Sequence, residues 1–116
     1  MNAANKLRIM LNFLNVPLSI PKKFIELQSF LESNPNFSDA PDVIVWVRNA
    51  IVHPKSKKRE KIANSHYKVR SESLDLQLWY IELFLLKIFD YNGVYINRCS
   101  SNYSNSGKRE KLPWLR

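Results

Sequence analysis

The residues best suited to chemistry lie together at positions 46–54, where a cation, an amide and an imidazole interrupt an apolar run. Arg48 interrupts an otherwise apolar run, and burying a guanidinium is costly unless it meets an anion or several acceptors. We therefore expect Arg48 to reach a cleft, an interface or a partner. Asn49 and His53 are four residues apart and share a helical face. Pro54 disfavours helical geometry at the residue before it, so the imidazole of His53 can turn back toward Arg48.

The element that must position these residues is predicted to be a helix over residues 41–53. Asp39 is a suitable N-cap for it, and Pro54 provides a stop after about thirteen residues, a typical helix length. Residues 43–47 are β-branched or aromatic and on propensity alone could form a buried strand. The start and stop signals favour the helix.

Three further helices are predicted from apolar spacing: residues 4–14, a segment that begins at Pro21 and precedes a loop at 34–40, and a segment from a Ser73 cap to Phe89. Twelve of the sixteen residues at 74–89 are apolar or aromatic, so this helix is expected to be buried on most sides. Its aromatic side chains are predicted to be core residues: Trp79, Tyr80, Phe84 and Phe89. The segment is shorter than the roughly 20 residues of a transmembrane span, so no membrane partner is expected.

The remaining segments are predicted to lack long regular elements. Residues 55–73 form a basic connection rich in Lys and Arg. Asn92-Gly93 offers a left-handed stop, after which residues 94–97 are predicted to form one further turn. Residues 99–116 are expected to be a basic, mostly irregular tail with few apolar anchors.

Composition limits the class of protein. The chain has 116 residues, a formal charge of +8 and one Cys, which fits one domain over residues 1–98 followed by the tail. Its 45% apolar content is too high for intrinsic disorder, and a lone Cys excludes an intrachain disulfide or a multi-Cys metal site. Neither a metal nor another cofactor is predicted. A reducing cytoplasm fits best, because no N-terminal run has the flanks of a signal peptide.

The stretch containing Arg48, Asn49 and His53, followed by Pro54, resembles the signature of the HEPN family, the higher eukaryotes and prokaryotes nucleotide-binding domains. The likeness extends from about Phe24 through the apolar helix at 74–89. It implies an all-α, antiparallel bundle of four to five helices that forms a homodimer and brings two copies of the motif to one cleft.

The same resemblance implies an RNA-directed module, since many relatives are metal-independent endoribonucleases of toxin or defence systems. His53 would transfer a proton as the ribose 2′-hydroxyl attacks phosphorus, Arg48 would stabilise phosphoryl charge, and Asn49 would orient the imidazole or the phosphate. The RNA backbone would be held by the basic run Lys55, Lys57, Lys58, Arg59 and Lys61. An antitoxin or a fused domain is the further partner that such systems imply.

A second interpretation is kept beside the first. Other HEPN relatives bind nucleotides or partner proteins without cleaving RNA, and Arg48 and His53 can equally serve packing at the end of a bundle helix. Because the matched region is preceded by one short helix, the chain could also be a fragment of a larger protein. Such a fragment would expose a large apolar patch where a missing element belongs.

Overall fold

The computed structural model describes residues 2–52, 67–100 and 109–115. Most of this chain is helical: α1 (Ala3–Phe13), α2 (Ile25–Glu32), α3 (Ala40–Val52) and α5 (Tyr67–Ile88). Two short strands, β1 (Val94–Ile96) and β2 (Arg109–Lys111), and a 3-10 turn (Pro113–Leu115) complete it. The mainly helical class is confirmed, whereas the small sheet was not predicted.

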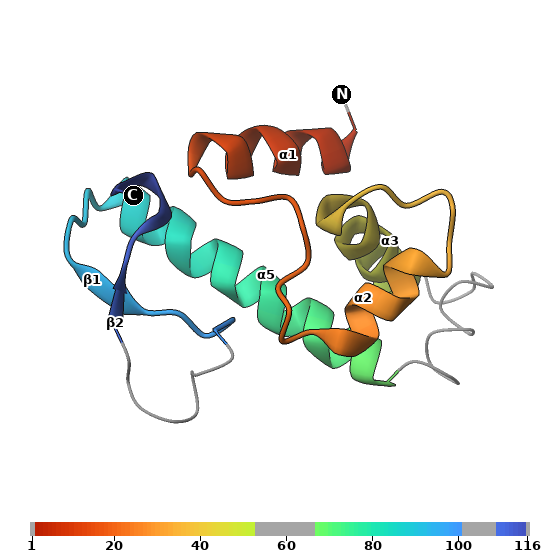
Figure 1. Ribbon diagram of the computed structural model, residues 1–116. Coiled ribbons are helices and arrows are strands. Elements are labelled where there is room, and N and C mark those ends of the chain that lie inside the picture. Colours follow the sequence, from red (N-terminus) through yellow and green to blue (C-terminus); the bar gives the residue numbers. More distant parts are fainter. Residues whose placement is uncertain (1, 53–66, 101–108, 116) are drawn as a thin grey trace.

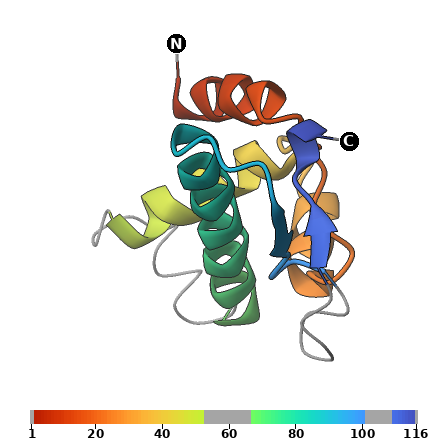
Figure 2. The ribbon, with the colours of Figure 1, turned by 90° about the vertical axis from the view of Figure 1, so that its left-hand side faces the viewer.

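The long helix α5 is the element around which the others pack (Figure 1). Helices α2 and α3 contact it, and α1 packs on α3. Figure 2, turned by 90°, shows α1 crossing above one end of α5 and the two strands beside it. The interior is filled by large apolar side chains from every helix and from the C-terminal segment, among them Leu11, Leu27, Val43, Val47, Leu76, Leu83 and Leu112.

The predicted helix at the motif is confirmed as α3. An Asp39 carboxylate oxygen accepts a hydrogen bond from the Asp42 N–H at 3.3 Å, as expected of an N-cap. Tertiary contacts decide the local ambiguity at residues 43–47, because Val43, Ile44 and Val47 are buried together on one face of the helix. Trp46 packs against the rings of Phe30 and Phe37.

Helix α2 begins later than predicted. Pro21 starts a turn instead of a helix, and its carbonyl accepts a hydrogen bond from the Phe24 N–H at 3.0 Å. Phe24 then occupies the N-cap position, where its ring is buried. Burial of this aromatic ring outweighs the preference of Pro21 for the first helical position.

Helix α5 begins six residues before Ser73, within the segment predicted to be a basic connection. Val69 is buried, and the Glu72 carboxylate accepts a hydrogen bond from the Leu27 N–H of α2 at 2.9 Å. Ser73 is not a cap: its buried hydroxyl accepts a hydrogen bond from the Gln77 amide at 3.1 Å. The burial of Val69 and the contact between Leu27 and Glu72 extend the helix to positions before its continuous apolar sequence begins.

The irregular tail predicted for residues 99–116 is corrected over 109–115. Strand β2 pairs antiparallel with β1, so the further helical turn predicted at 94–97 is also wrong. The Tyr95 hydroxyl of β1 accepts a hydrogen bond from the Trp79 indole at 3.2 Å, and the Asn97 amide donates to Glu110 at 2.8 Å. A sequence-local pattern cannot reveal pairing across this separation.

The turn after α5 differs from the predicted Asn92-Gly93 stop. Asp90 takes the left-handed conformation, with φ of 56°, which Asp tolerates better than most residues. Gly93 has a different role, because a Cβ there would collide with the Tyr91 ring. The Tyr91 hydroxyl donates a hydrogen bond to the Val94 carbonyl at 2.7 Å.

Candidate functional site

Arg48 and Asn49 lie near the C-terminal end of α3, which begins with a capped turn and ends at Val52. Arg48 is exposed, and its Nη1 donates a hydrogen bond to the Asn49 carbonyl oxygen Oδ1 at 3.2 Å. Arg48 was expected to reach a cleft, an interface or a partner, and its role stays a prediction. The guanidinium reaches solvent from the outer side of the helix.

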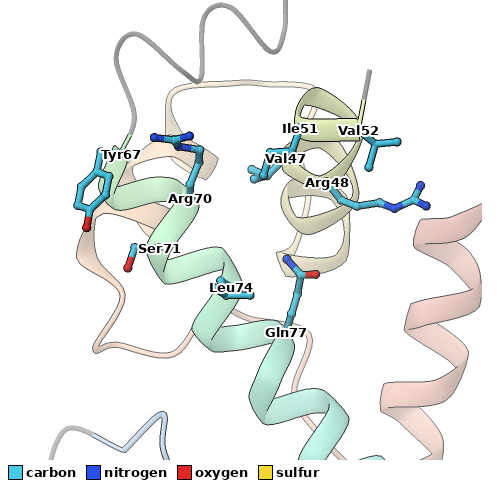
Figure 3. Close-up of a pocket in the computed structure, with 9 residues that line it drawn as sticks. All are labelled: Val47, Arg48, Ile51, Val52, Tyr67, Arg70, Ser71, Leu74 and Gln77. Carbon is cyan, nitrogen blue, oxygen red and sulfur yellow. The ribbon is translucent and has the colours of Figure 1, made fainter. Parts of the chain in front are cut away.

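A groove of about 500 Å³ lies between α3 and α5, and the Arg48 side chain forms part of its wall. The lining is mostly apolar, with Val47, Ile51, Val52 and Leu74, and it also includes Tyr67, Arg70, Ser71 and Gln77. Figure 3 shows the Arg48 guanidinium pointing away from α5, whereas Arg70 lies over the first turns of α5. The Arg70 guanidinium is 6.0 Å from the Tyr67 ring centroid. The two guanidiniums therefore do not converge.

Asn49 lines a different hollow, of about 350 Å³, beside the start of α1. Its neighbours there include Asn2, Phe37 and Trp46. The first two residues of the predicted motif are thus joined by a hydrogen bond but open onto separate depressions of the surface.

His53 and the predicted RNA-binding residues Lys55, Lys57, Lys58, Arg59 and Lys61 lie outside the described residues. Their roles stay predictions. The residues on either side of this segment, Val52 and Tyr67, both line the groove between α3 and α5.

An exposed apolar surface on α5 was missed by the sequence analysis. Every seventh residue of α5 is large, apolar or aromatic, and exposed: Tyr67 (73%), Leu74 (56%), Ile81 (53%) and Ile88 (58%). Leu85 (46%) lies beside them, and these five residues are called the α5 face below. The predictions that Phe84 and Phe89 are core residues are wrong, because both are exposed, whereas Trp79 and Tyr80 are buried as predicted. The seven-residue spacing was the signal that could have revealed this face.

A second groove, of about 240 Å³, runs between α1 and α5 along the α5 face. Leu7 and Met10 form the α1 wall, and Gln77 lines both this groove and the first one. Tyr80 also lines it, and burial raises the pKa of its phenol, so that this residue stays neutral. The two grooves share Gln77 as a lining residue, and the second is lined by uncharged side chains, whereas Arg48 and Arg70 line the first.

Neither a membrane span nor a metal cluster is found in the described residues. No helix over 2–52, 67–100 or 109–115 combines the length and apolarity that crossing a membrane requires. In the same part of the chain, no three His, Cys, Asp or Glu residues lie close enough together to hold a metal ion.

Comparison with known proteins corrects the predicted family. A model of the YopA C-terminal domain family matches residues 1–109. The chain is also 37% identical over 114 residues to the SPbeta prophage-derived uncharacterized protein YopA of Bacillus subtilis (strain 168), an alignment covering 98% of this chain and 24% of that protein. It thus spans about a quarter of the length of this relative. No solved structure matches it. The HEPN resemblance is wrong, because an Arg with a His five residues later is too short a pattern to define a family.

Proposed function

The chain belongs to the YopA C-terminal domain family, and we propose that it acts as a protein-interaction domain whose contact surface is the α5 face. The observation that supports this proposal is the row of exposed side chains at seven-residue spacing along the whole of α5. Soluble monomers rarely leave contiguous apolar patches of more than a few hundred Å² in water.

The opposite side of α5 already supplies the core of the domain, with Leu76, Tyr80 and Leu83 buried. The α5 face is the side of α5 that the rest of the described chain leaves about half exposed. Fully burying a Leu or Ile side chain is worth roughly 1.5–3 kcal/mol, so covering a row of half-exposed residues yields a large gain on association. Gln77 lines two grooves beside this row of exposed residues, and such grooves can receive the apolar side chains of a helical partner.

The proposal is tested by selecting binders from a phage-displayed peptide library on the immobilised chain. The selected peptides are expected to carry apolar residues at i, i+3 or i+4, and i+7, the pattern of a helix laid in a groove. Binding is expected to be lost with Ile81→Glu. Ile25→Glu is the matched control, since Ile25 is equally apolar and exposed but lies on α2, which contacts α5 on the side of Glu72. Peptides that bind Ile81→Glu as well as the unsubstituted chain would refute the proposal.

RNA binding, with cleavage by Arg48 and His53, is a second candidate function. The supporting observations are the exposed guanidinium of Arg48 and the formal charge of +8. A solvent-facing guanidinium can contact a phosphodiester, and cationic surfaces bind nucleic acids in a salt-dependent way.

This candidate is tested by incubating the purified chain with single-stranded RNA in EDTA and following the products. Cleavage that leaves a 2′,3′-cyclic phosphate and is lost in both Arg48→Ala and His53→Ala, with unchanged circular dichroism, is the expected result. Lys22→Ala, at an exposed Lys before α2, serves as the control. A real cleavage activity that survives both substitutions would remove Arg48 and His53 from the catalytic role.

A further inference from the structure

We propose that the α5 face pairs with the α5 face of a second copy of this chain, in an antiparallel two-fold dimer centred on Ile81. This inference rests on the proposed interaction function and names its partner. Leu74 and Ile88 are each seven residues from Ile81. A two-fold axis at Ile81 therefore places Leu74 of one copy opposite Ile88 of the other.

The spacing of the α5 face suits helix-to-helix packing. A repeat of seven residues keeps one stripe of a helix facing a partner over several turns, as in coiled coils. The stripe runs from the first residue of α5, Tyr67, to the last, Ile88. Because an isologous interface uses the same patch on both copies, a stripe that is apolar throughout complements itself.

Two charged side chains of α5 in this stretch, Glu82 and Lys87, are engaged away from the stripe. Glu82 forms an ion pair with Arg98. The Lys87 ammonium lies 5.4 Å from the Phe13 ring centroid and 5.3 Å from that of Trp114. Two copies can therefore approach along α5 without burying either of these charges at the centre of the contact.

The helix dipole of α5 favours the antiparallel arrangement. Side-chain charge does not distinguish the two ends, because Lys68 and Arg70 lie in the first turns and Lys87 lies in the last turn. The backbone dipole adds positive potential at the N-terminal end and negative potential at the C-terminal end. An antiparallel pair brings opposite ends together, whereas a parallel pair would bring like ends together.

The exposed area approaches that of a standard-size interface. From their exposed fractions, the residues of the α5 face other than Tyr67, together with Phe84 and Phe89, leave on the order of 600 Å² in water, compared with roughly 800 Å² that each partner contributes to such an interface. The same residues would form the apolar centre of the contact, where substitutions have the largest effect on affinity.

The first experiment measures the mass of the full chain by sedimentation equilibrium from 1 to 200 µM. A reversible monomer–dimer equilibrium is expected, and Ile81→Glu should raise the dissociation constant by at least about tenfold while circular dichroism stays unchanged. Ile25→Glu should leave the dissociation constant of the dimer unaltered. Salt should strengthen the dimer, because two copies of charge +8 repel each other and the contact is apolar. A monomer at 200 µM, or a dimer that Ile81→Glu leaves intact, overturns the proposal.

The second experiment tests the register and does not depend on how well a charge is tolerated at Ile81. A mixture of Leu74→Cys and Ile88→Cys chains should form a mixed disulfide under mild oxidation, and Ile81→Cys should link to itself. Ile25→Cys, the control, should remain monomeric. Linking of Leu74→Cys to itself in preference to Ile88→Cys would overturn the antiparallel arrangement.

The outcomes separate this inference from the function on which it rests. A chain that stays monomeric but captures amphipathic peptides through Ile81 would overturn the pairing of copies and retain the interaction domain. A chain that neither pairs nor captures peptides would overturn both.

Discussion

At the scale of single residues, Arg8 donates hydrogen bonds to three side chains, those of Asn5, Asp39 and Asp42. It joins α1 to the start of α3: its Nε lies 2.7 Å from Asp39 Oδ2, and its Nη2 lies 2.5 Å from Asp42 Oδ1. Burial alone would raise the pKa of Asp42, but hydrogen bonds from the Ser38 N–H and hydroxyl and from Arg8 outweigh it and lower that pKa below its usual 3.8. The ionised form of Asp42 therefore stabilises the fold.

The substitution Arg8→Ala should reduce the free energy of unfolding by roughly 1–3 kcal/mol at pH 7, because two partly buried carboxylates lose a charged donor. Since the pKa of Asp42 is lowered by folding, its contribution is complete above the pKa of the unfolded chain and is lost as pH falls through the lower, folded value. Without Arg8 that folded value rises, so acid unfolding should begin at a higher pH. Urea titrations from pH 2 to 7 measure both effects. Lys6→Ala, at an exposed position of the same helix, should change neither.

Cys99 is a second residue whose surroundings predict its behaviour. Burial raises the pKa of its thiol to about 12, so little thiolate forms at neutral or mildly alkaline pH. Because it is the one Cys in the sequence, its reaction with a disulfide reagent at pH 8 can be followed without interference. The folded chain should react at least about a hundredfold more slowly than the chain in guanidinium chloride. Equal rates would mean that the thiol is not buried in solution.

At the scale of elements, the segment from β2 to the final 3-10 turn binds the helices together. Leu112 is fully buried, and the Asn15 side-chain amide, at the end of α1, donates a hydrogen bond to the Pro113 carbonyl at 2.9 Å. Asn15 takes a left-handed backbone conformation, with φ of 59°, that ends α1 and directs its side chain to this contact. The C-terminal segment is therefore a structural part of the domain.

The substitution Leu112→Ala should destabilise the domain by about 2–5 kcal/mol, because it removes a side chain from a closed core and leaves a cavity. A fall in the midpoint of urea unfolding at constant m-value would measure this loss. Leu115→Ala is the control, since Leu115 is 42% exposed in the same segment and should cost under about 1 kcal/mol. Equal effects of the two substitutions would contradict the burial of Leu112.

The elements also differ in how far the sequence predicts them. Helix α3 could be placed to within a residue, because a cap at Asp39 and a stop at Pro54 are local signals. The start of α5 could not, since it depends on the burial of Val69 and on a hydrogen bond from α2 to Glu72. The pairing of β1 with β2 was missed for the same reason. Of the candidate site, the sequence predicted that Arg48 reaches a cleft, an interface or a partner, but the groove that it lines depends on the placement of α5.

At the scale of the whole molecule, the two sides of α5 have different roles. One side forms the core with α2 and α3, and the other is apolar and open to solvent. The prediction of a helix buried on most sides is wrong, because the α5 face is exposed. In the proposed dimer a second copy of the chain would cover that face. Stability and association should therefore be linked.

This linkage predicts that the midpoint of thermal unfolding rises with protein concentration. A partner that binds only the folded state stabilises it by mass action, so a hundredfold increase in concentration should raise the midpoint by several degrees. Scanning calorimetry at several concentrations measures the slope. The Ile81→Glu chain should have a midpoint that does not depend on concentration. A concentration-independent midpoint in both chains would contradict the linkage.

The contact between Asn15 and Pro113 has a consequence for the synthesis of this protein on the ribosome. Residues 109–115 are translated last among those described, yet they cover the end of the first helix and fill the interior with Leu112. A nascent chain can form its individual helices in or near the exit tunnel, but it cannot complete its hydrophobic core until this segment has emerged. Cooperative folding of the domain is therefore delayed until after residue 115 has left the ribosome.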